Sequence, residues 1–170
     1  MGSYIDGKHE VVLWIAEHAP DNATILDVGP CDGIWSDFVR AICPDVQMDA
    51  CEIFAPNIVA HDLAHKYRRV YAQDIATLKY EHYDLVIFGD VLEHMTVEKA
   101  QAVLAYAKEH ATDYVIGIPF QYRQGPLYGN EWERHIQDDL TPEIFEQRYP
   151  GHELIIRPRG DYAYYHRRGK

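Results

Sequence analysis

Carboxylate side chains follow the strands that this sequence predicts, at the ends where a ligand would bind. Asp27 lies in the first β-prone run, Glu52 directly follows the second, Asp74 lies beyond the third, and Asp90 follows the fourth. In a parallel α/β sheet, ligands bind outside the carboxyl ends of the strands. The sequence therefore predicts an acidic cleft that takes a cationic or neutral polar ligand rather than a polyphosphate.

A turn with two glycines, Gly29-Pro-Cys-Asp-Gly33, follows the first run. Its GxxxG spacing is not the GxGxxG of a dinucleotide site, and it is not a P-loop, because no Lys-Ser/Thr follows Gly33. One interpretation is that the glycines only form a tight strand-to-helix turn. Asp27 favours a binding role, since a carboxylate in a buried strand is costly without a partner.

Helical and extended segments alternate along the chain and must position these residues. Apolar spacing predicts helices over residues 8–18, 34–43, 56–67, 96–110 and 142–149, with Asp6, Thr96 and Thr141 as N-caps. Extended runs are predicted over residues 23–28, 46–51, 69–72, 83–88, 113–119, 153–157 and 162–166. This alternation predicts an α/β fold with a parallel sheet, and the short turn at 158–160 predicts an antiparallel hairpin at one edge.

Four segments, in this order, resemble the motifs of class I S-adenosylmethionine-dependent methyltransferases: Ile25–Gly33, Glu52, Gln73–Ile75 and Tyr83–His94. The ending Leu92-Glu-His94 resembles small-molecule methyltransferases of the ubiquinone-biosynthesis type. The resemblance implies a Rossmann-like three-layer sandwich with a mostly parallel seven-stranded sheet. The matching motifs run from about residue 23 to 119, and the length of 170 residues without a linker predicts that residues 1–170 form a single domain, which the resemblance identifies as an S-adenosylmethionine-binding methyltransferase domain.

The resemblance further implies how S-adenosylmethionine is held, with S-adenosylhomocysteine as the product. Glu52 would accept hydrogen bonds from the ribose hydroxyls, Asp74 would accept from the adenine amino group, and Ile75 would pack on the adenine ring. An acidic cleft complements the sulfonium and ammonium groups of this cofactor. The implied cofactor-binding residues are Asp27, Gly29, Pro30, Cys31, Asp32, Gly33, Glu52, Ile53, Asp74, Ile75, Asp90, Val91 and Leu92.

Cys31 stands where the family usually has a middle glycine. We expect its side chain to narrow the pocket near the methionine moiety or to shift the backbone. A reactive thiol is the alternative interpretation, but no His lies next to Cys31 in the sequence to activate it.

Methyl transfer is an in-line displacement, and alignment of the acceptor alone can favour it by roughly 7–11 kcal/mol. A general base is needed only for a hydroxyl or a protonated amine, and His94 and His135 are the candidates. His135 lies in the long segment 120–140, which we expect to fold over the cleft as a lid. There are two alternatives. His94 could serve only to hydrogen-bond to the backbone, and the aromatic residues of the segment could serve only to pack the lid. The candidate substrate-contacting residues are Tyr122, Tyr128, Glu131 and Trp132.

Two pairs of residues have the i, i+4 spacing of metal ligands on a helix: Glu131 with His135, and His61 with His65. Such pairs are more often solvated than metal-bound, so the spacing favours no metal site.

The net charge of −11, from 16 Lys+Arg and 27 Asp+Glu, disfavours a nucleic-acid or anionic membrane surface. The three cysteines form no CxxC pair and no apolar run reaches the ~20 residues of a membrane span, which favours the cytoplasm. A small-molecule acceptor would then be held by the N-terminal helix, the 120–140 segment and, in a homodimer, the second subunit. Two other functions stay open: a non-catalytic module that binds S-adenosylmethionine or a nucleotide, and an NAD-type oxidoreductase, which the missing GxGxxG disfavours.

Overall fold

The computed structural model describes residues 5–169, and its strands and helices alternate as the sequence predicts. The strands are β1 (Thr24–Val28), β2 (Gln47–Cys51), β3 (Arg69–Tyr71), β4 (Tyr83–Gly89), β5 (Ala111–Pro119), β6 (Glu153–Arg159) and β7 (Tyr162–Arg168). The helices are α1 (Lys8–His18), α2 (Ile34–Ile42), α3 (Ala55–Ala60), α4 (Leu63–Lys66), α5 (Val97–His110) and α6 (Pro142–Arg148). Two short 3₁₀ turns, η1 (Leu92–His94) and η2 (Glu131–Glu133), lie in the connections.

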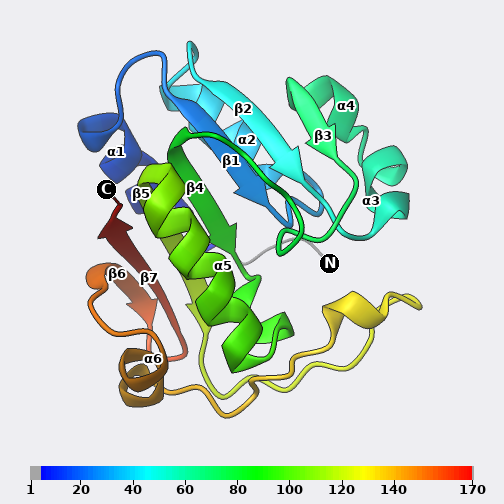
Figure 1. Cartoon of the computed structure of the whole chain (residues 1–170), viewed down its shortest axis with the longest axis vertical. Coiled ribbons are helices and arrows are strands. Elements are labelled where there is room, and N and C mark those ends of the chain that lie inside the picture. The colour runs from blue at the N-terminus through cyan, green and yellow to red at the C-terminus, as the bar shows by residue number, and fades with distance from the viewer. Residues whose placement is uncertain (1–4, 170) are drawn as a thin grey trace.

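In the described part of the chain, the seven strands form one sheet in the order β3-β2-β1-β4-β5-β7-β6 (Figure 1). The strands from β3 to β5 pair in parallel. β7 runs antiparallel to both of its neighbours, β5 and β6. The predicted parallel sheet with an antiparallel edge hairpin is therefore confirmed. The order reverses between β1 and β4, where a parallel sheet opens a crevice for a ligand.

Helices cover both faces of the sheet and give the predicted three-layer sandwich. On one face, α5 packs on apolar side chains of the central strands that include Leu26, Val86 and Phe88; Figure 1 shows this helix in front of the sheet. On the other face, α1 and α2 pack on the alternate residues Ile25 and Ile87. The central strands are buried on both sides, which explains their almost continuous apolar runs.

Side-chain caps define the starts of two helices as predicted. The Thr96 hydroxyl accepts a hydrogen bond from the Lys99 amide (3.3 Å) at the start of α5. The Thr141 hydroxyl accepts one from the Ile144 amide (3.2 Å) at the start of α6. The predicted cap of α1 is wrong, because Gly7 is the N-cap residue and Asp6 instead forms an ion pair with Arg159 of β6.

The single helix predicted over residues 56–67 is also wrong, because it is broken into α3 and α4. Asp62 adopts a left-handed conformation (φ 52°) between them. Ile58 and Leu63 both pack in the same cluster, yet in one continuous helix they would point about 140° apart. The break lets both side chains face the sheet. Among the described helices, none combines the length and apolar character needed to cross a membrane.

Candidate functional site

A cavity of about 440 Å³ lies over the carboxyl ends of β1, β2 and β4 and beneath the 120–140 segment. This volume lies in the usual range for small-molecule sites, roughly 300–1,000 Å³. The predicted site residues that line it are Gly29, Cys31, Glu52, Ile53, Asp74, Ile75, Asp90, Val91, His94, Tyr122, Trp132 and His135. The predicted site residues that do not line it are Asp27, Pro30, Asp32, Gly33, Leu92, Tyr128 and Glu131.

The turn after β1 has three residues in the left-handed region: Gly29 (φ 66°), Cys31 (φ 51°) and Gly33 (φ 77°). A Cβ atom at Gly29 would lie 3.0 Å from the Val91 side chain, so glycine also permits close packing there. The backbone at Cys31 keeps the left-handed conformation that a glycine at this position would adopt, although Cys31 has a side chain. Burial raises the pKa of the Cys31 thiol to about 11, so the thiol is not an activated nucleophile.

Asp27 lies in β1, two residues before Gly29, and does not line the cavity. It is fully buried, and its Oδ2 accepts a hydrogen bond from the Tyr67 hydroxyl (2.5 Å). Burial raises the pKa of Asp27 to about 7, while the Tyr67 hydrogen bond and the Lys8 charge act in the opposite direction. Asp32 has a local role too, because its Oδ1 accepts a hydrogen bond from the Ile34 amide (3.2 Å) at the start of α2.

Glu52 connects the end of β2 to the glycine turn. Its Oε1 accepts from the Phe54 amide (2.8 Å) and its Oε2 from the Cys31 amide (3.3 Å). The residue is 3% exposed and lines the cavity. Burial raises the pKa of Glu52, whereas the backbone amides and the Asn57 side chain lower it. Each carboxylate oxygen has two acceptor positions, so Glu52 keeps capacity to accept hydrogen bonds from a ligand.

Asp74 and Ile75 line the cavity beyond β3, beside a lysine that the sequence analysis did not include. Asp74 Oδ2 accepts from Lys99 Nζ (2.6 Å) and Oδ1 from the Ala76 amide (2.9 Å). Ile75 is 8% exposed and presents an apolar surface. Among the described lining residues, Lys99 is the one Lys or Arg, and its charge is matched by Asp74.

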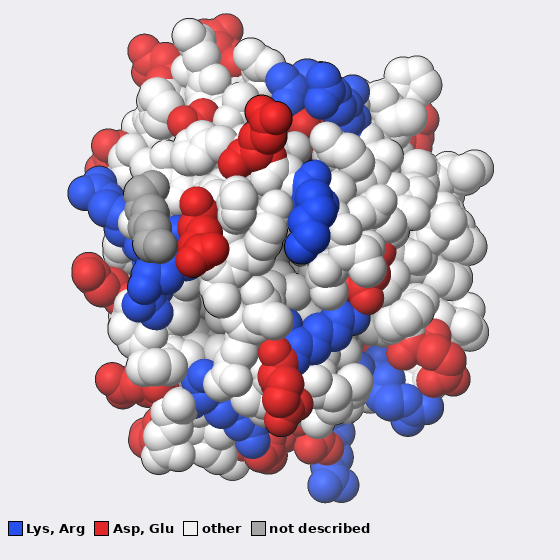
Figure 2. All heavy atoms as spheres, viewed as in Figure 1, with Lys and Arg blue, Asp and Glu red and all other residues white. Residues whose placement is uncertain are grey.

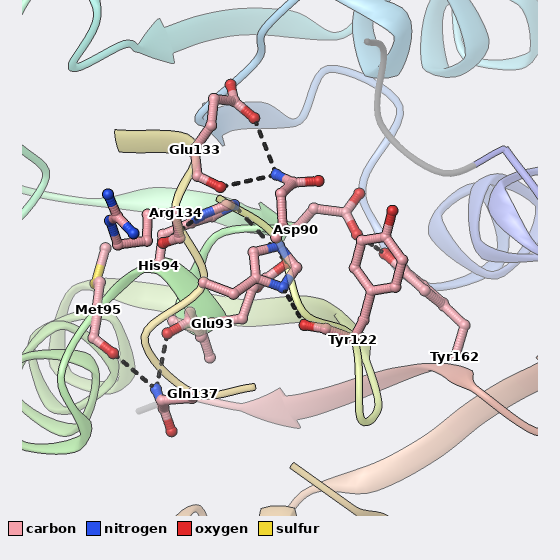
Figure 3. Close-up of polar contacts among 12 residues, drawn as sticks. Asp90, Glu93, His94, Met95, Tyr122, Glu133, Arg134, Gln137 and Tyr162 are labelled. Carbon is pink, nitrogen blue, oxygen red and sulfur yellow. Dashed lines mark hydrogen bonds and ion pairs between the residues drawn. The ribbon is translucent and has the colours of Figure 1, made fainter. Parts of the chain in front are cut away.

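The turn after β4 presents Asp90 to the cavity in a left-handed conformation (φ 58°). Asp90 Oδ1 accepts a hydrogen bond from the Tyr162 hydroxyl of β7 (2.6 Å), a pair visible in Figure 3. Val91 lines the cavity beside it, but Leu92 is completely buried in the core below α5. Of residues 89–95, Leu92 alone does not line the cavity, because its side chain packs in that core.

The 120–140 segment covers the cavity and is fastened to the turn after β4. The amides of Ile136 and Gln137 donate to the Glu93 carbonyl (2.8 and 3.0 Å). The Gln137 side chain donates to the carbonyls of Leu92 (2.8 Å) and Met95 (3.1 Å), as Figure 3 shows for Met95. These contacts hold the second half of the segment in place.

Two of the four predicted substrate-contacting residues lie at the cavity. Tyr122 and Trp132 line it and are about half exposed, so they form an aromatic rim. Tyr128 is 90% exposed and Glu131 pairs with Arg134 (3.0 Å), both away from the cavity. The N-terminal helix α1 contributes no lining residue among those described, so it does not form the acceptor site as predicted.

The two histidines that are the candidate bases lie together in the cavity, where the turn after β4 meets the 120–140 segment. Their ring centroids are 4.7 Å apart and nearly perpendicular. Burial lowers the pKa of His94 and of His135, which favours the neutral imidazole of each. Each Nε2 lies 4.0 Å from Oε1 of Glu93. Glu93 belongs to the Leu92–His94 motif but was not predicted as a site residue.

Several other residues line the cavity but were not predicted as site residues, because no local sequence pattern indicates them. Glu133 lies between Glu131 and His135, and the i, i+4 spacing of a helix selected Glu131 instead. Tyr162 comes from the last strand, far from every motif. The missed polar or charged lining residues are Asn57, Gln73, Glu93, Lys99, Gln124, Asn130, Glu133, Asp161 and Tyr162.

The electrostatics of the cavity are acidic, as predicted. Six carboxylate residues line it, namely Glu52, Asp74, Asp90, Glu93, Glu133 and Asp161, against Lys99. On the face drawn in Figure 2, Lys and Arg side chains are interspersed with Asp and Glu, and no broad basic patch forms there. The charges complement a cationic or neutral ligand better than a polyphosphate.

No family model and no curated protein sequence matches the chain. Solved structures do match. One is a proposed O-methyltransferase from Nostoc punctiforme, with a TM-score of 0.68 and 15% identity, over 94% of this chain and 54% of that one. This chain thus spans about half the length of that protein.

Two further solved structures contain a bound nucleoside product. The N-terminal domain of EvdMO1 with SAH bound has a TM-score of 0.71 and 14% identity, over 99% of this chain and 83% of that one. The 1,6-didemethyltoxoflavin-N1-methyltransferase of Burkholderia thailandensis, with S-adenosylhomocysteine bound, has a TM-score of 0.64 and 18% identity, over 96% and 77%. The chain therefore has the fold of the S-adenosylmethionine-dependent methyltransferases.

Proposed function

We propose that this protein transfers a methyl group from S-adenosylmethionine to a small-molecule acceptor. The observation that carries the proposal is Glu52, a buried carboxylate at the end of β2 that lines the cavity and holds the amide of Cys31 in the glycine turn. A carboxylate with unused acceptor positions suits a ribose diol. Both the fold and the acidic cavity support the same assignment.

The lining residues fit the parts of this cofactor. Glu52 would hold the ribose hydroxyls, while Ile53, Ile75 and Val91 supply apolar surface for the adenine ring. Asp74 would accept from the adenine amino group with the acceptor positions that Lys99 leaves unused. When bound, S-adenosylmethionine supplies an electrophilic methyl group on a positively charged sulfur.

The chain's own contribution would be to align the acceptor and exclude water. Tyr122 and Trp132 would hold an acceptor with a flat or apolar part against the cavity. The 120–140 segment would shield the site from solvent. The free thiols of the three cysteines support a location in the cytoplasm.

Thermal unfolding with a panel of ligands tests the proposal. S-adenosylmethionine and S-adenosylhomocysteine at about 100 times their Kd should stabilise the protein by about 2.7 kcal/mol, or about 5–10 °C in Tm for a chain of this size. NAD and NADP should give no shift. A shift with NAD alone would instead support the oxidoreductase.

Turnover separates an enzyme from a non-catalytic binding module. Formation of S-adenosylhomocysteine should depend on added acceptor when small hydroxylated and aminated aromatic compounds are screened. Binding without acceptor-dependent turnover across the screen would favour the binding module.

A further inference from the structure

Three side chains that could bind a metal ion converge where η1 meets the 120–140 segment. A carboxylate oxygen of Glu93 and one ring nitrogen each of His94 and His135 all lie within 4.8 Å of one another. Figure 3 shows Glu93 and His94 side by side beneath the segment that carries Glu133 and Arg134. Two ligands come from the turn after β4 and the third from the loop that covers it.

The hydrogen bonds of both histidines leave the same nitrogen available. His94 Nδ1 lies 3.1 Å from the Arg134 carbonyl, and His135 Nδ1 lies 2.8 Å from the Tyr122 carbonyl. A carbonyl oxygen only accepts, so each Nδ1 carries the proton and each Nε2 presents its lone pair. Metal-binding histidines in proteins are typically held by this kind of backbone contact.

The burial of Glu93 is independent evidence for a cation at this position. Its side chain is 1% exposed, and among the described residues neither carboxyl oxygen has a hydrogen-bond partner. Burial and the negative charges of Asp90 and Glu133 raise its pKa well above the usual range. A buried carboxylate without partners costs several kcal/mol. A cation beside it would offset that cost.

We propose that Glu93, His94 and His135 bind a divalent transition metal ion. Two imidazoles and one carboxylate suit zinc, iron(II), cobalt or manganese, whereas magnesium and calcium prefer oxygen ligands throughout. With metal–ligand bonds of about 2.0–2.1 Å, tetrahedral ligand atoms lie about 3.4 Å apart. The ligand atoms are separated by up to 4.8 Å, and closing them to that spacing needs a shift of less than about 1 Å for each atom, within the reach of side-chain rotation.

The metal site would also determine which methyl acceptor the protein prefers, an inference that rests on the proposed function. All three ligands line the cavity beside Tyr122 and Trp132, so the open coordination positions face the acceptor side. A coordinated hydroxyl group becomes more acidic. Its proton would pass to the Glu133 carboxylate in the same cavity. The oxygen lone pair then forms the new C–O bond, and the electron pair of the broken C–S bond stays on sulfur. The acceptor would therefore carry a hydroxyl group.

Cobalt(II) titration of the whole, chelator-treated chain tests the metal site. We expect one equivalent of Co²⁺ to bind, with visible absorption bands, and to be displaced by Zn²⁺ but not by a hundredfold excess of Mg²⁺. Glu93→Gln, His94→Ala and His135→Ala should each weaken binding tenfold or more. His61→Ala, an exposed histidine outside the cavity, should bind Co²⁺ like the parent. Circular dichroism of every variant confirms that it is folded.

The outcomes separate this inference from the proposed function. Calorimetry with S-adenosylhomocysteine is run on the same samples. Stoichiometric Co²⁺ binding that only the three ligand variants weaken supports the metal site, even where S-adenosylhomocysteine does not bind. Absent Co²⁺ binding, or equal affinity in folded Glu93→Gln and His135→Ala variants, overturns the metal site and leaves the methyltransferase proposal to its own test.

Discussion

At the scale of single residues, Glu52 is the side chain on which cofactor binding should depend most. Glu52→Gln keeps the size and one acceptor oxygen but removes the charge that two backbone amides share with the ligand. We expect the Kd for S-adenosylhomocysteine, measured by calorimetry, to rise about 10- to 100-fold, because a hydrogen bond to a charged group contributes about 1.5–3 kcal/mol. Glu17→Gln, on the exposed side of α1, is the control and should leave the Kd unchanged. An unchanged Kd for Glu52→Gln would contradict the assignment.

Cys31 offers a second test, of backbone conformation. Its left-handed φ of 51° is strained for a residue with a side chain. Cys31→Gly should therefore increase the free energy of unfolding by about 0–1 kcal/mol. Cys43→Gly should lower it by at least about 0.5–1 kcal/mol. Cys43 has an ordinary φ of −118°, so glycine there adds freedom to the unfolded chain, and it also removes a side chain that packs against the core. Urea unfolding measures both, and a loss in Cys31→Gly as large as in Cys43→Gly would show that the turn needs the thiol.

At the scale of elements, the fastening of the 120–140 segment should control its mobility. Gln137 is 4% exposed and bonds to two carbonyls of the turn after β4 and to the Tyr149 hydroxyl. Gln137→Ala leaves these groups unsatisfied and should cost about 2–4 kcal/mol of stability. Limited proteolysis should then cut within residues 120–140 several times faster than in the parent. Gln101→Ala removes one bond from an exposed glutamine to the Arg148 carbonyl and should change the rate little.

Trp132 belongs to the same segment but should act on the acceptor alone. Trp132→Ala should lower kcat/KM for the acceptor about tenfold, equivalent to about 1.4 kcal/mol, since the aromatic rim loses one of its two side chains. The Kd for S-adenosylhomocysteine should stay nearly the same. Trp132 borders the Asp74 side of the cavity, where Lys99 Nζ lies 6.0 Å from its ring centroid, but the ion pair between Lys99 and Asp74 does not require the ring. Tyr128→Ala, at the exposed tip of the segment, is the control. Equal loss in both variants would indicate a general loosening of the segment.

The elements themselves were largely predictable from the sequence, whereas the path of this segment was not. Helices such as α5 can be predicted from the spacing of their apolar residues and from a threonine N-cap, and both are local signals. Gln137 finds its partners 42 and 45 positions away, which no local pattern encodes. Arg134 is extended (φ −70°, ψ 127°), so the helical spacing that paired Glu131 with His135 does not apply. Glu93 was overlooked because its direction depends on the short η1 turn.

At the scale of the whole molecule, His152 should make stability depend on pH. Its Nδ1 donates to the Tyr149 carbonyl (2.7 Å) and its Nε2 accepts from the Tyr114 hydroxyl (3.0 Å), an arrangement that requires the neutral ring. Burial, with smaller contributions from Arg167 and His166, lowers the pKa of His152 from 6.5 to about 4. Between these values the unfolded chain binds the proton and the folded one does not. Stability is therefore full above pH 6.5 and falls as the pH drops toward 4.

The expected size of this effect is about 1–2 kcal/mol at pH 5, or about 3–6 °C in Tm. His152→Gln keeps a donor and an acceptor without a titrating group. The Tm of the parent should fall more than the Tm of the variant as the pH drops from 7 to 5, as calorimetric scans at matched ionic strength can measure. His18→Gln, exposed at the end of α1, controls for the loss of a histidine. Parallel Tm profiles for parent and His152→Gln would rule out this origin.

The place of β7 in the sheet also bears on how the protein is made. β7 is the last strand in the chain, yet it pairs with both β5 and β6 and brings Tyr162 to Asp90 across 72 residues. On the ribosome, β5 emerges with one unpaired edge and keeps it until β7 has followed, a time of several seconds at about 5–20 residues per second. Exposed strand edges invite aggregation and chaperone binding. The contact between Tyr162 and Asp90 at the cavity can form only after residues 162–168 have emerged, so a ligand that uses this cavity can stabilise the chain only from that point on.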